Sequence, residues 1–194
     1  AQALINIQFR LVEFSPDLII LMNNLNDLSV KLYGKRISPD YSNKYMRPFF
    51  LAPELQGGLS LYGLLNQSRV LMKLRIPALF LDKEKEVENA QYGFQIFKRN
   101  LKHIAAICDL HNIDLLLLSQ PLLWNDQHQG FHEYNNAIKQ VADDSRVHYF
   151  DMHTNMGQEP DLFTDTIHYT LKGVKKFSAL LAPVVSDILE KRKY

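Results

Sequence analysis

The sequence has 194 residues, which is enough for one domain with a sizeable apolar core. Its hydrophobic fraction of 46% and charged fraction of 22% are those of an ordinary globular protein, and a formal net charge of +1 argues against a broad nucleic-acid-binding surface. Cys108 is the only cysteine, which excludes an intrachain disulfide and a cysteine-built zinc site, and its apolar neighbours predict a buried structural thiol.

The two ends of the chain carry little functional signal. The sequence opens without Met on Ala1-Gln-Ala-Leu-Ile-Asn6, which resembles the middle of an amphipathic helix, so we expect residues to be missing upstream. Apolar positions through residue 14 fit a helix in part, with a short strand as the alternative. The basic run Lys191-Arg-Lys193 is expected to be a solvated helix end that complements the helix dipole.

Two short apolar runs, at residues 18–22 and 113–118, predict buried strands of a parallel sheet. Residues 147–150 are predicted to form a third strand. No run reaches 18 apolar residues, so no segment is expected to span a bilayer.

Helical patterns separate these strands. Apolar spacing predicts helices over about 83–111, 131–143 and 171–190. Strands that alternate with helices indicate one three-layer α/β/α domain with a flavodoxin-like, mostly parallel sheet. Residues 34–80 are rich in turn signals and are expected to be an irregular insert, with one helix at about 61–75.

Polar clusters follow the predicted strands. Asn23 to Asp27 follows the first strand, Ser119-Gln120 the second, and a loop with Asp165 and His168 comes after the third. Open parallel sheets bind ligands beyond the carboxyl ends of their strands, so these distant segments are expected to meet at one edge.

Asp165 and His168 are three residues apart, just before the last predicted helix. This spacing lets the carboxylate accept a hydrogen bond from the imidazole Nδ1–H, which leaves Nε2 as a general base at neutral pH. The alternative is that Asp165 or Thr166 caps the last helix and His168 packs against it.

The segment Asn24-Leu-Asn26-Asp27 follows a buried strand, where an asparagine amide is suited to donate to a developing oxyanion. The alternative is that these residues only form a turn and cap a helix.

Taken together, these segments resemble the SGNH (GDSL-type) serine hydrolases. The run Leu18-Ile-Ile-Leu-Met-Asn-Asn-Leu-Asn26-Asp27 is similar to the family block in which an apolar strand ends in Gly-x-Asn-Asp. The run Asp165-Thr-Ile-His168-Tyr-Thr-Leu-Lys-Gly173 is similar to the block with Asp-x-x-His and an early helical glycine. The strand Val147 to Asp151 fits the family's last strand.

The resemblance implies a role for each matched residue. Asn26 matches the oxyanion-hole asparagine, His168 the general base and Asp165 the acid that orients it. Asn24 departs from the pattern because it stands where many members have Gly. Asp27 is then expected to be a structural turn residue.

The family's nucleophilic serine and its oxyanion-hole glycine precede the asparagine block, and only 25 residues precede Asn26 here. The sequence therefore resembles the later part of the family's fold, without its first strands, and the nucleophile is expected upstream of Ala1. Ser60, in Gly58-Leu-Ser-Leu61, lacks the family's Asp and is expected to be a helix cap. Ser119 follows a strand but comes in the wrong order for the nucleophile.

Two further groups of residues have alternative interpretations. His128, His132 and Glu133 include two metal-ligand types, but Gly130 interrupts their helix and no third ligand is evident, so no metal or other cofactor is expected.

Trp124, Phe131 and Tyr134 are expected either to line an acyl or sugar pocket or, equally, to pack in the core. The insert is expected to form a lid or an oligomer contact.

The residues predict a serine-type ester hydrolase acting through an acyl-enzyme, on a small-molecule, carbohydrate or lipid ester. The alternative is a non-catalytic ligand- or carbohydrate-binding domain on the same fold. A nucleotide-binding protein is disfavoured because no Gly-rich phosphate loop is present. Related bacterial proteins are often exported or anchored through the N-terminus, and the resemblance leaves the oligomeric state open.

Overall fold

The computed structural model describes residues 2–24, 83–123 and 129–192. The chain divides into two compact units, one made of residues 1–28 and 94–194 and the other of residues 29–93. In chain order the elements are α1 Gln2–Asn6, the π-helical turn η1 Ile7–Leu11, the 3-10 turn η2 Val12–Phe14, β1 Leu18–Leu21, α5 Lys83–Leu110, β2 Asp114–Leu118, α6 Gln129–Ser145, β3 His148–Phe150, α7 Met152–Met156, the 3-10 turn η6 Pro160–Leu162 and α8 Leu171–Arg192.

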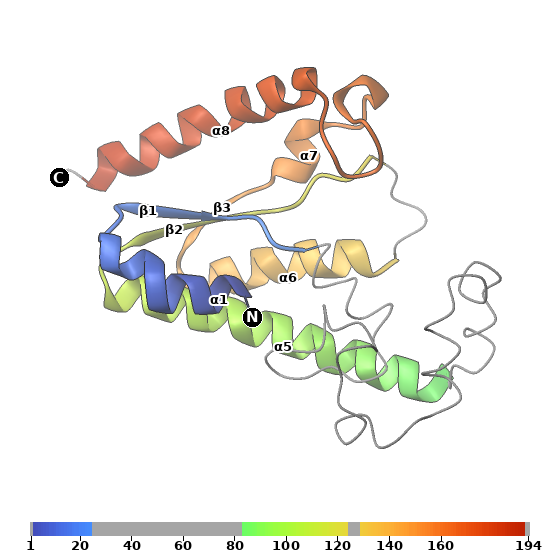
Figure 1. The fold of residues 1–194 in the computed structure, drawn as a ribbon, viewed down its shortest axis with the longest axis horizontal. Coiled ribbons are helices and arrows are strands. Elements are labelled where there is room, and N and C mark those ends of the chain that lie inside the picture. The colour runs from blue at the N-terminus through green and yellow to red at the C-terminus, as the bar shows by residue number, and fades with distance from the viewer. Residues whose placement is uncertain (1, 25–82, 124–128, 193–194) are drawn as a thin grey trace. The chain divides into compact units, whose positions relative to one another are not determined.

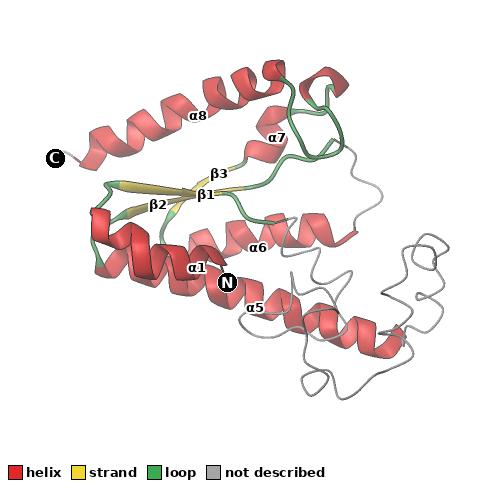
Figure 2. Cartoon of the chain, in the orientation of Figure 1, coloured by secondary structure: helices red, strands yellow, loops and turns green. Residues whose placement is uncertain are grey.

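The described strands form one parallel sheet in the order β1-β2-β3. The register places Ile19 beside Leu115 and Leu117 beside Tyr149. Helices cover both faces of this sheet, as Figures 1 and 2 show. The predicted three-layer α/β/α fold with a parallel sheet is therefore confirmed.

The central strand β2 is buried on both faces, and for this reason its sequence shows no alternation of apolar and polar residues. Leu115 and Leu117 belong to the core on one face of the sheet, whereas Leu116 and Leu118 belong to the core on the other. All four side chains are at most 2% exposed. Burial of a leucine side chain contributes about 1.5–3 kcal/mol, so a strand covered on both faces favours an unbroken apolar run.

The two faces carry different helices. Helices α1, α5 and α6 lie on one face, and α7 and α8 lie on the other (Figure 1). The first face holds the larger core, which includes Phe97, Tyr134 and Cys108. Cys108 is 1% exposed, and burial raises the pKa of its thiol to about 11, so the predicted structural thiol is confirmed.

The helices α5 and α6 end in the same way before the strands that follow them. Asn112 and Arg146 adopt positive φ angles of 54° and 55°. The next residues, Ile113 and Val147, donate their backbone N–H groups back to Cys108 and Ala142, at 2.8 and 3.1 Å. This Schellman arrangement satisfies the last helical carbonyls and aims the chain at the sheet.

The predicted strands and the three long helices are confirmed to within a few residues, and residues 2–14 are helical rather than extended. The short helix α7 and the turn η6 were not predicted. The insert at 34–80, its helix at 61–75 and its role as a lid lie outside the described residues, and the single-domain organisation stays a prediction. Among the described helices none is long and apolar enough to cross a membrane.

Candidate functional site

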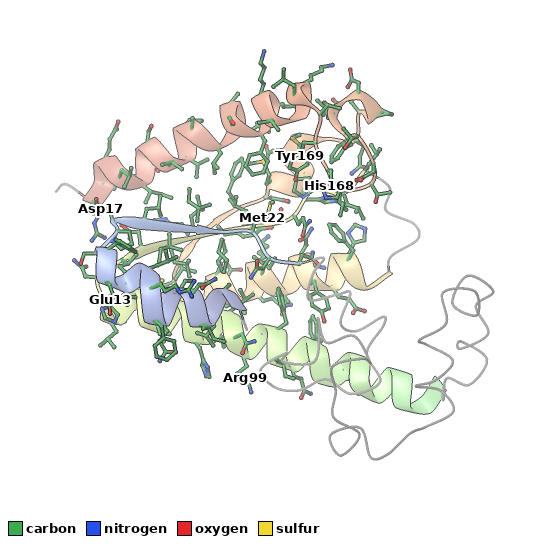
Figure 3. All side chains as sticks on the ribbon, in the orientation of Figure 1. Glu13, Asp17, Met22, Arg99, His168 and Tyr169 are labelled. Carbon is green, nitrogen blue, oxygen red and sulfur yellow. The ribbon has the colours of Figure 1, made fainter. Side chains whose placement is uncertain are left out.

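The polar clusters that follow the strands lie at the carboxyl end of the sheet. Figure 3 shows Met22, just after β1, toward the same end as His168, with Asp17 at the opposite end. Side chains from the ends of β2 and β3 bond to each other there, since the Ser119 hydroxyl donates to the Asp151 carboxylate at 2.7 Å. The expected convergence on one edge of the sheet is observed for the described residues.

The loop that carries Asp165 and His168 is a small hairpin. Phe163 and Tyr169 form an antiparallel bridge, and the backbone N–H of Thr164 donates to the His168 carbonyl at 2.8 Å. The loop after β2 is tied to this hairpin, because the Leu123 N–H donates to the Thr166 carbonyl at 3.0 Å. Asp165 and His168, called the dyad from here on, therefore lie on a loop that several backbone hydrogen bonds hold in place.

Within this hairpin, Asp165 holds His168 with both carboxylate oxygens. Oδ2 lies 2.7 Å from His168 Nδ1, while Oδ1 accepts the backbone N–H groups of Ile167 and His168, each at 2.8 Å. A carboxylate at this distance favours the tautomer with a proton on Nδ1 and a lone pair on Nε2. Nε2 has no hydrogen-bond partner within the part of the chain that the structure describes.

Both members of the pair are accessible, with side chains 70% exposed for His168 and 53% for Asp165. The hydrogen bonds from the His168 side chain and from the backbone of Ile167 and His168 lower the pKa of Asp165 to about 2. The carboxylate is thus ionised at neutral pH. Because its pKa in the folded protein lies below the ordinary value of 3.8, the ionised carboxylate favours folding above that pH, and this contribution disappears as the pH falls through about 2.

The first turn of α8 is capped by Thr170, and this corrects the alternative in which Asp165 or Thr166 caps the helix. Thr170 Oγ1 accepts the Gly173 N–H at 3.1 Å and donates to the Asp161 carbonyl at 2.7 Å. Asp165 instead bonds to residues of its own loop.

Gly173 has a steric reason for its place in the motif. A Cβ atom at this position would lie 2.0 Å from the carbonyl oxygen of Leu162. The first turn of α8 therefore packs directly on the backbone of η6, and only glycine leaves room for that contact.

Ser119 has a structural role that occupies its hydroxyl. It is 1% exposed, donates to Asp151 Oδ1 and accepts the His153 backbone N–H at 2.9 Å. Burial raises the pKa of Asp151, but hydrogen bonds from Ser119 and Thr154 outweigh that effect and leave the pKa lowered. Ser119 is thus locked at the start of α7 rather than presented to His168.

Asn24 is fully buried at the end of β1. Its Nδ2 donates to the Phe131 carbonyl at 3.2 Å and to Asn135 Oδ1 at 2.7 Å. Asn135 was not singled out from the sequence; the signal that could have found it is its place one helical turn after Phe131, on the face of α6 that turns toward the sheet. The predicted oxyanion residue Asn26 lies outside the described residues, as do Asp27, Ser60, Trp124 and His128.

The remaining candidates belong to the core or stack on it. Phe131 and Tyr134 are 0% exposed and pack in the core, which agrees with the core-packing alternative for these two residues. His132 lies on α6 with its ring centroid 5.8 Å from that of His153 on α7. The described residues contain no group of three or more His, Cys, Asp or Glu side chains arranged to hold a metal ion.

Comparisons with known proteins find relatives at the level of structure. No family matches the sequence, and no curated protein matches it. A solved variant of Axe2, an acetyl xylan esterase from Geobacillus stearothermophilus, aligns with a TM-score of 0.53 and 12% identity over 91% of this chain. LAE5, an alpha/beta hydrolase enzyme from the metagenome of Lake Arreo in Spain, aligns with a TM-score of 0.55 and 12% identity over 95% of this chain.

These alignments cover only part of the neighbours. The chain spans 62% of the length of Axe2 and 66% of that of LAE5. At this identity the likeness concerns the fold alone. The chain has an α/β fold that solved esterases and hydrolases share, with an exposed Asp–His pair at the end of its sheet.

Proposed function

We propose that this protein is a serine-type ester hydrolase that acts through an acyl-enzyme. His168 is the general base, Asp165 orients it, and Asn26 donates to the oxyanion. The observation that carries the proposal is the 2.7 Å contact between Asp165 and His168 Nδ1, which leaves Nε2 accessible beyond the carboxyl ends of the strands.

The chemistry follows from the state of the imidazole. With its proton on Nδ1, His168 takes the serine hydroxyl proton at Nε2 as the serine oxygen attacks the ester carbonyl. The ionised Asp165 then stabilises the imidazolium, which returns the proton to the leaving alcohol. Water repeats the sequence to hydrolyse the acyl-enzyme.

The nucleophile is proposed to come from residues that precede Ala1. Within residues 2–24, 83–123 and 129–192 no serine hydroxyl bonds to His168, and Ser119 is engaged elsewhere. One of the solved Axe2 structures is a catalytic mutant in which a serine is replaced by alanine. The chain's 62% coverage of that protein leaves room in the whole fold for a serine-bearing strand.

The proposed substrates are small-molecule, carbohydrate or lipid esters. Axe2 is described as an acetyl-xylooligosaccharide esterase, which supports testing acetylated sugars first. The exposed position of the dyad is compatible with a polymeric or bulky alcohol.

The test uses the natural full-length protein, a fluorophosphonate probe and p-nitrophenyl acetate. We expect covalent labelling of one serine, and His168→Ala should lower hydrolysis by about 10⁴–10⁶-fold. The matched control is His148→Ala, because His148 also faces an aspartate but lies at the other end of the sheet. Absence of labelling, together with hydrolysis that survives His168→Ala, would overturn the proposed mechanism. A full-length protein that shows neither labelling nor hydrolysis would favour the non-catalytic ligand-binding domain.

A further inference from the structure

We infer that Asn135 is a positioning residue that ties the ends of β1 and β2 to the Asp165–His168 loop of the proposed site; this inference rests on the proposed function. Asn135 lies on α6, away from both sequence motifs, and its side chain is 7% exposed. It connects the end of β1 with the segment that supports the Asp165–His168 loop.

The first step of the connection is the end of β2. Asn135 Oδ1 accepts the backbone N–H of Gln120 at 3.0 Å, and Asn135 Nδ2 donates to the Gln120 carbonyl at 3.1 Å. One side-chain amide therefore pairs with both backbone groups of a single residue, as a neighbouring strand would. Gln120 lies just past the last ladder bond between β2 and β3, where its backbone groups need such partners.

The second step is the end of β1. The same Asn135 Oδ1 accepts from Asn24 Nδ2 at 2.7 Å. Asn24 is 0% exposed, so this bond forms away from solvent, where the loss of one partner leaves a buried polar group unsatisfied. The two strand ends are thus fixed to one atom of Asn135.

The third step leads to the dyad. Three residues after Gln120, the Leu123 N–H donates to the Thr166 carbonyl, in the turn between Asp165 and His168. Gln158 Nε2 holds the same segment by donating to the Leu122 carbonyl at 2.8 Å. The path from Asn24 to the dyad therefore consists of hydrogen bonds and of residues 120–123, whose backbone is held by hydrogen bonds along this short stretch.

This path explains the departure of the sequence from the Gly-x-Asn-Asp pattern. A glycine at position 24 has no side chain to bond with Asn135. Asn24 supplies the amide that Asn135 accepts, so the end of β1 is anchored through a side chain. Since catalysis is sensitive to displacements of about 1 Å, a shift at this anchor is expected to reduce turnover rather than substrate binding.

The experiment is a double-mutant cycle in the full-length protein with p-nitrophenyl acetate. We expect Asn135→Ala to lower kcat by about 10–100-fold and to change KM by less than about threefold. If Asn135 acts by placing the Asp165–His168 loop, the same substitution in an Asp165→Asn background should cause almost no further loss of kcat. A merely structural role would give equal losses in both backgrounds, and that result would overturn the inference.

Asn100→Ala is the matched control. Asn100 is a buried asparagine on α5, 5% exposed, and its side chain accepts from the neighbouring Arg99 at 3.0 Å. Its substitution is expected to leave kcat unchanged. If Asn135→Ala fails to fold, Asn135→Asp replaces it, because this variant keeps the acceptor and turns the donor to Gln120 into a second acceptor. In a folded Asn135→Ala variant, which lacks the acceptor of the Gln120 N–H, amide hydrogen exchange at Gln120 should accelerate.

The outcomes separate the two hypotheses. Hydrolysis that depends on His168 but is unchanged by folded Asn135 variants would refute only the positioning role. Hydrolysis that survives His168→Ala would refute the proposed function, and the positioning role with it.

Discussion

Two histidine–aspartate pairs lie at opposite ends of the sheet, and they differ in distance, in the ring nitrogen that faces the carboxylate and in the other partners of that carboxylate. At the carboxyl end, His168 Nδ1 is 2.7 Å from Asp165, whose other oxygen bonds only to the backbone of its own loop. At the amino end, His148 Nε2 is 3.6 Å from Asp114, and Arg192 Nη1 binds the same carboxylate at 3.0 Å.

The difference bears on the proposed role of His168 as a general base. Asp114 shares its charge with a guanidinium, and it faces Nε2, the atom that a base of the Ser–His–Asp type needs to keep free. Asp165 faces Nδ1, and hydrogen bonds hold its pKa at about 2, so its full charge acts on one imidazole. Position beyond the carboxyl ends of the strands adds to these local features.

The largest effect that would test this comparison is expected from Asp165→Asn. The asparagine oxygen can still accept the two backbone N–H groups, but its NH₂ group would face Nδ1 and move the imidazole proton to Nε2. The base would then be lost, and kcat should fall by about 10²–10⁴-fold. The kcat of ester hydrolysis is measured for this variant and for Asp114→Asn, the matched control at the amino end of the sheet. Equal kcat values for the two variants would show that the pairs do not differ in function.

A smaller effect, on stability, is expected from Gly173→Ala at the base of the dyad loop. The new Cβ meets the Leu162 carbonyl oxygen, a backbone atom that cannot rotate away. We expect a loss of about 1–3 kcal/mol in the free energy of unfolding, measured with urea. Ser178→Ala, an exposed change on the same helix, should stay within about 0.5 kcal/mol. Wild-type stability in Gly173→Ala would mean that α8 does not press on η6.

The sequence predicted most of the described fold because burial leaves a strong pattern. Because β2 is covered on both faces, apolar residues are needed on both, and its run of leucines meets that need. The buried faces of α5 and α6 follow the helical period. The short helix α7 was missed because five residues give no period; its only local signal is Asp151, whose side chain accepts the Thr154 N–H at its N-terminus.

The candidate site was predicted only where its chemistry is local. The spacing of Asp165 and His168 predicted their contact, which a three-residue loop can form by itself. Asn135 could not be predicted in this way, since its partners Asn24 and Gln120 lie 111 and 15 residues away. Helical spacing after Phe131 places Asn135 on the buried face of α6, but its partners depend on which strands are neighbours, and no local pattern identifies them.

The smallest effect is expected from Arg192→Ala at the amino end. Arg192 binds Asp114 and Asp17, and it donates to the Asn112 carbonyl, so it ties the last turn of α8 to the turns before β1 and β2. Its side chain is 24% exposed, and partly exposed ion pairs contribute about 1 kcal/mol or less. We expect a loss of about 1 kcal/mol in urea unfolding with kcat unchanged.

Lys191→Ala provides the control for that substitution, because Lys191 pairs with Asp187 one turn away on the same helix while 72% exposed. The Lys191→Ala substitution should lower the free energy of unfolding by about 0.3–0.5 kcal/mol, as for other solvated ion pairs of this spacing. The measurement also tests the contrast between the ends of the sheet. If removing Arg192 lowered kcat as strongly as Asp165→Asn does, the charges at the amino end would be coupled to the site, and the two pairs could no longer be treated as independent.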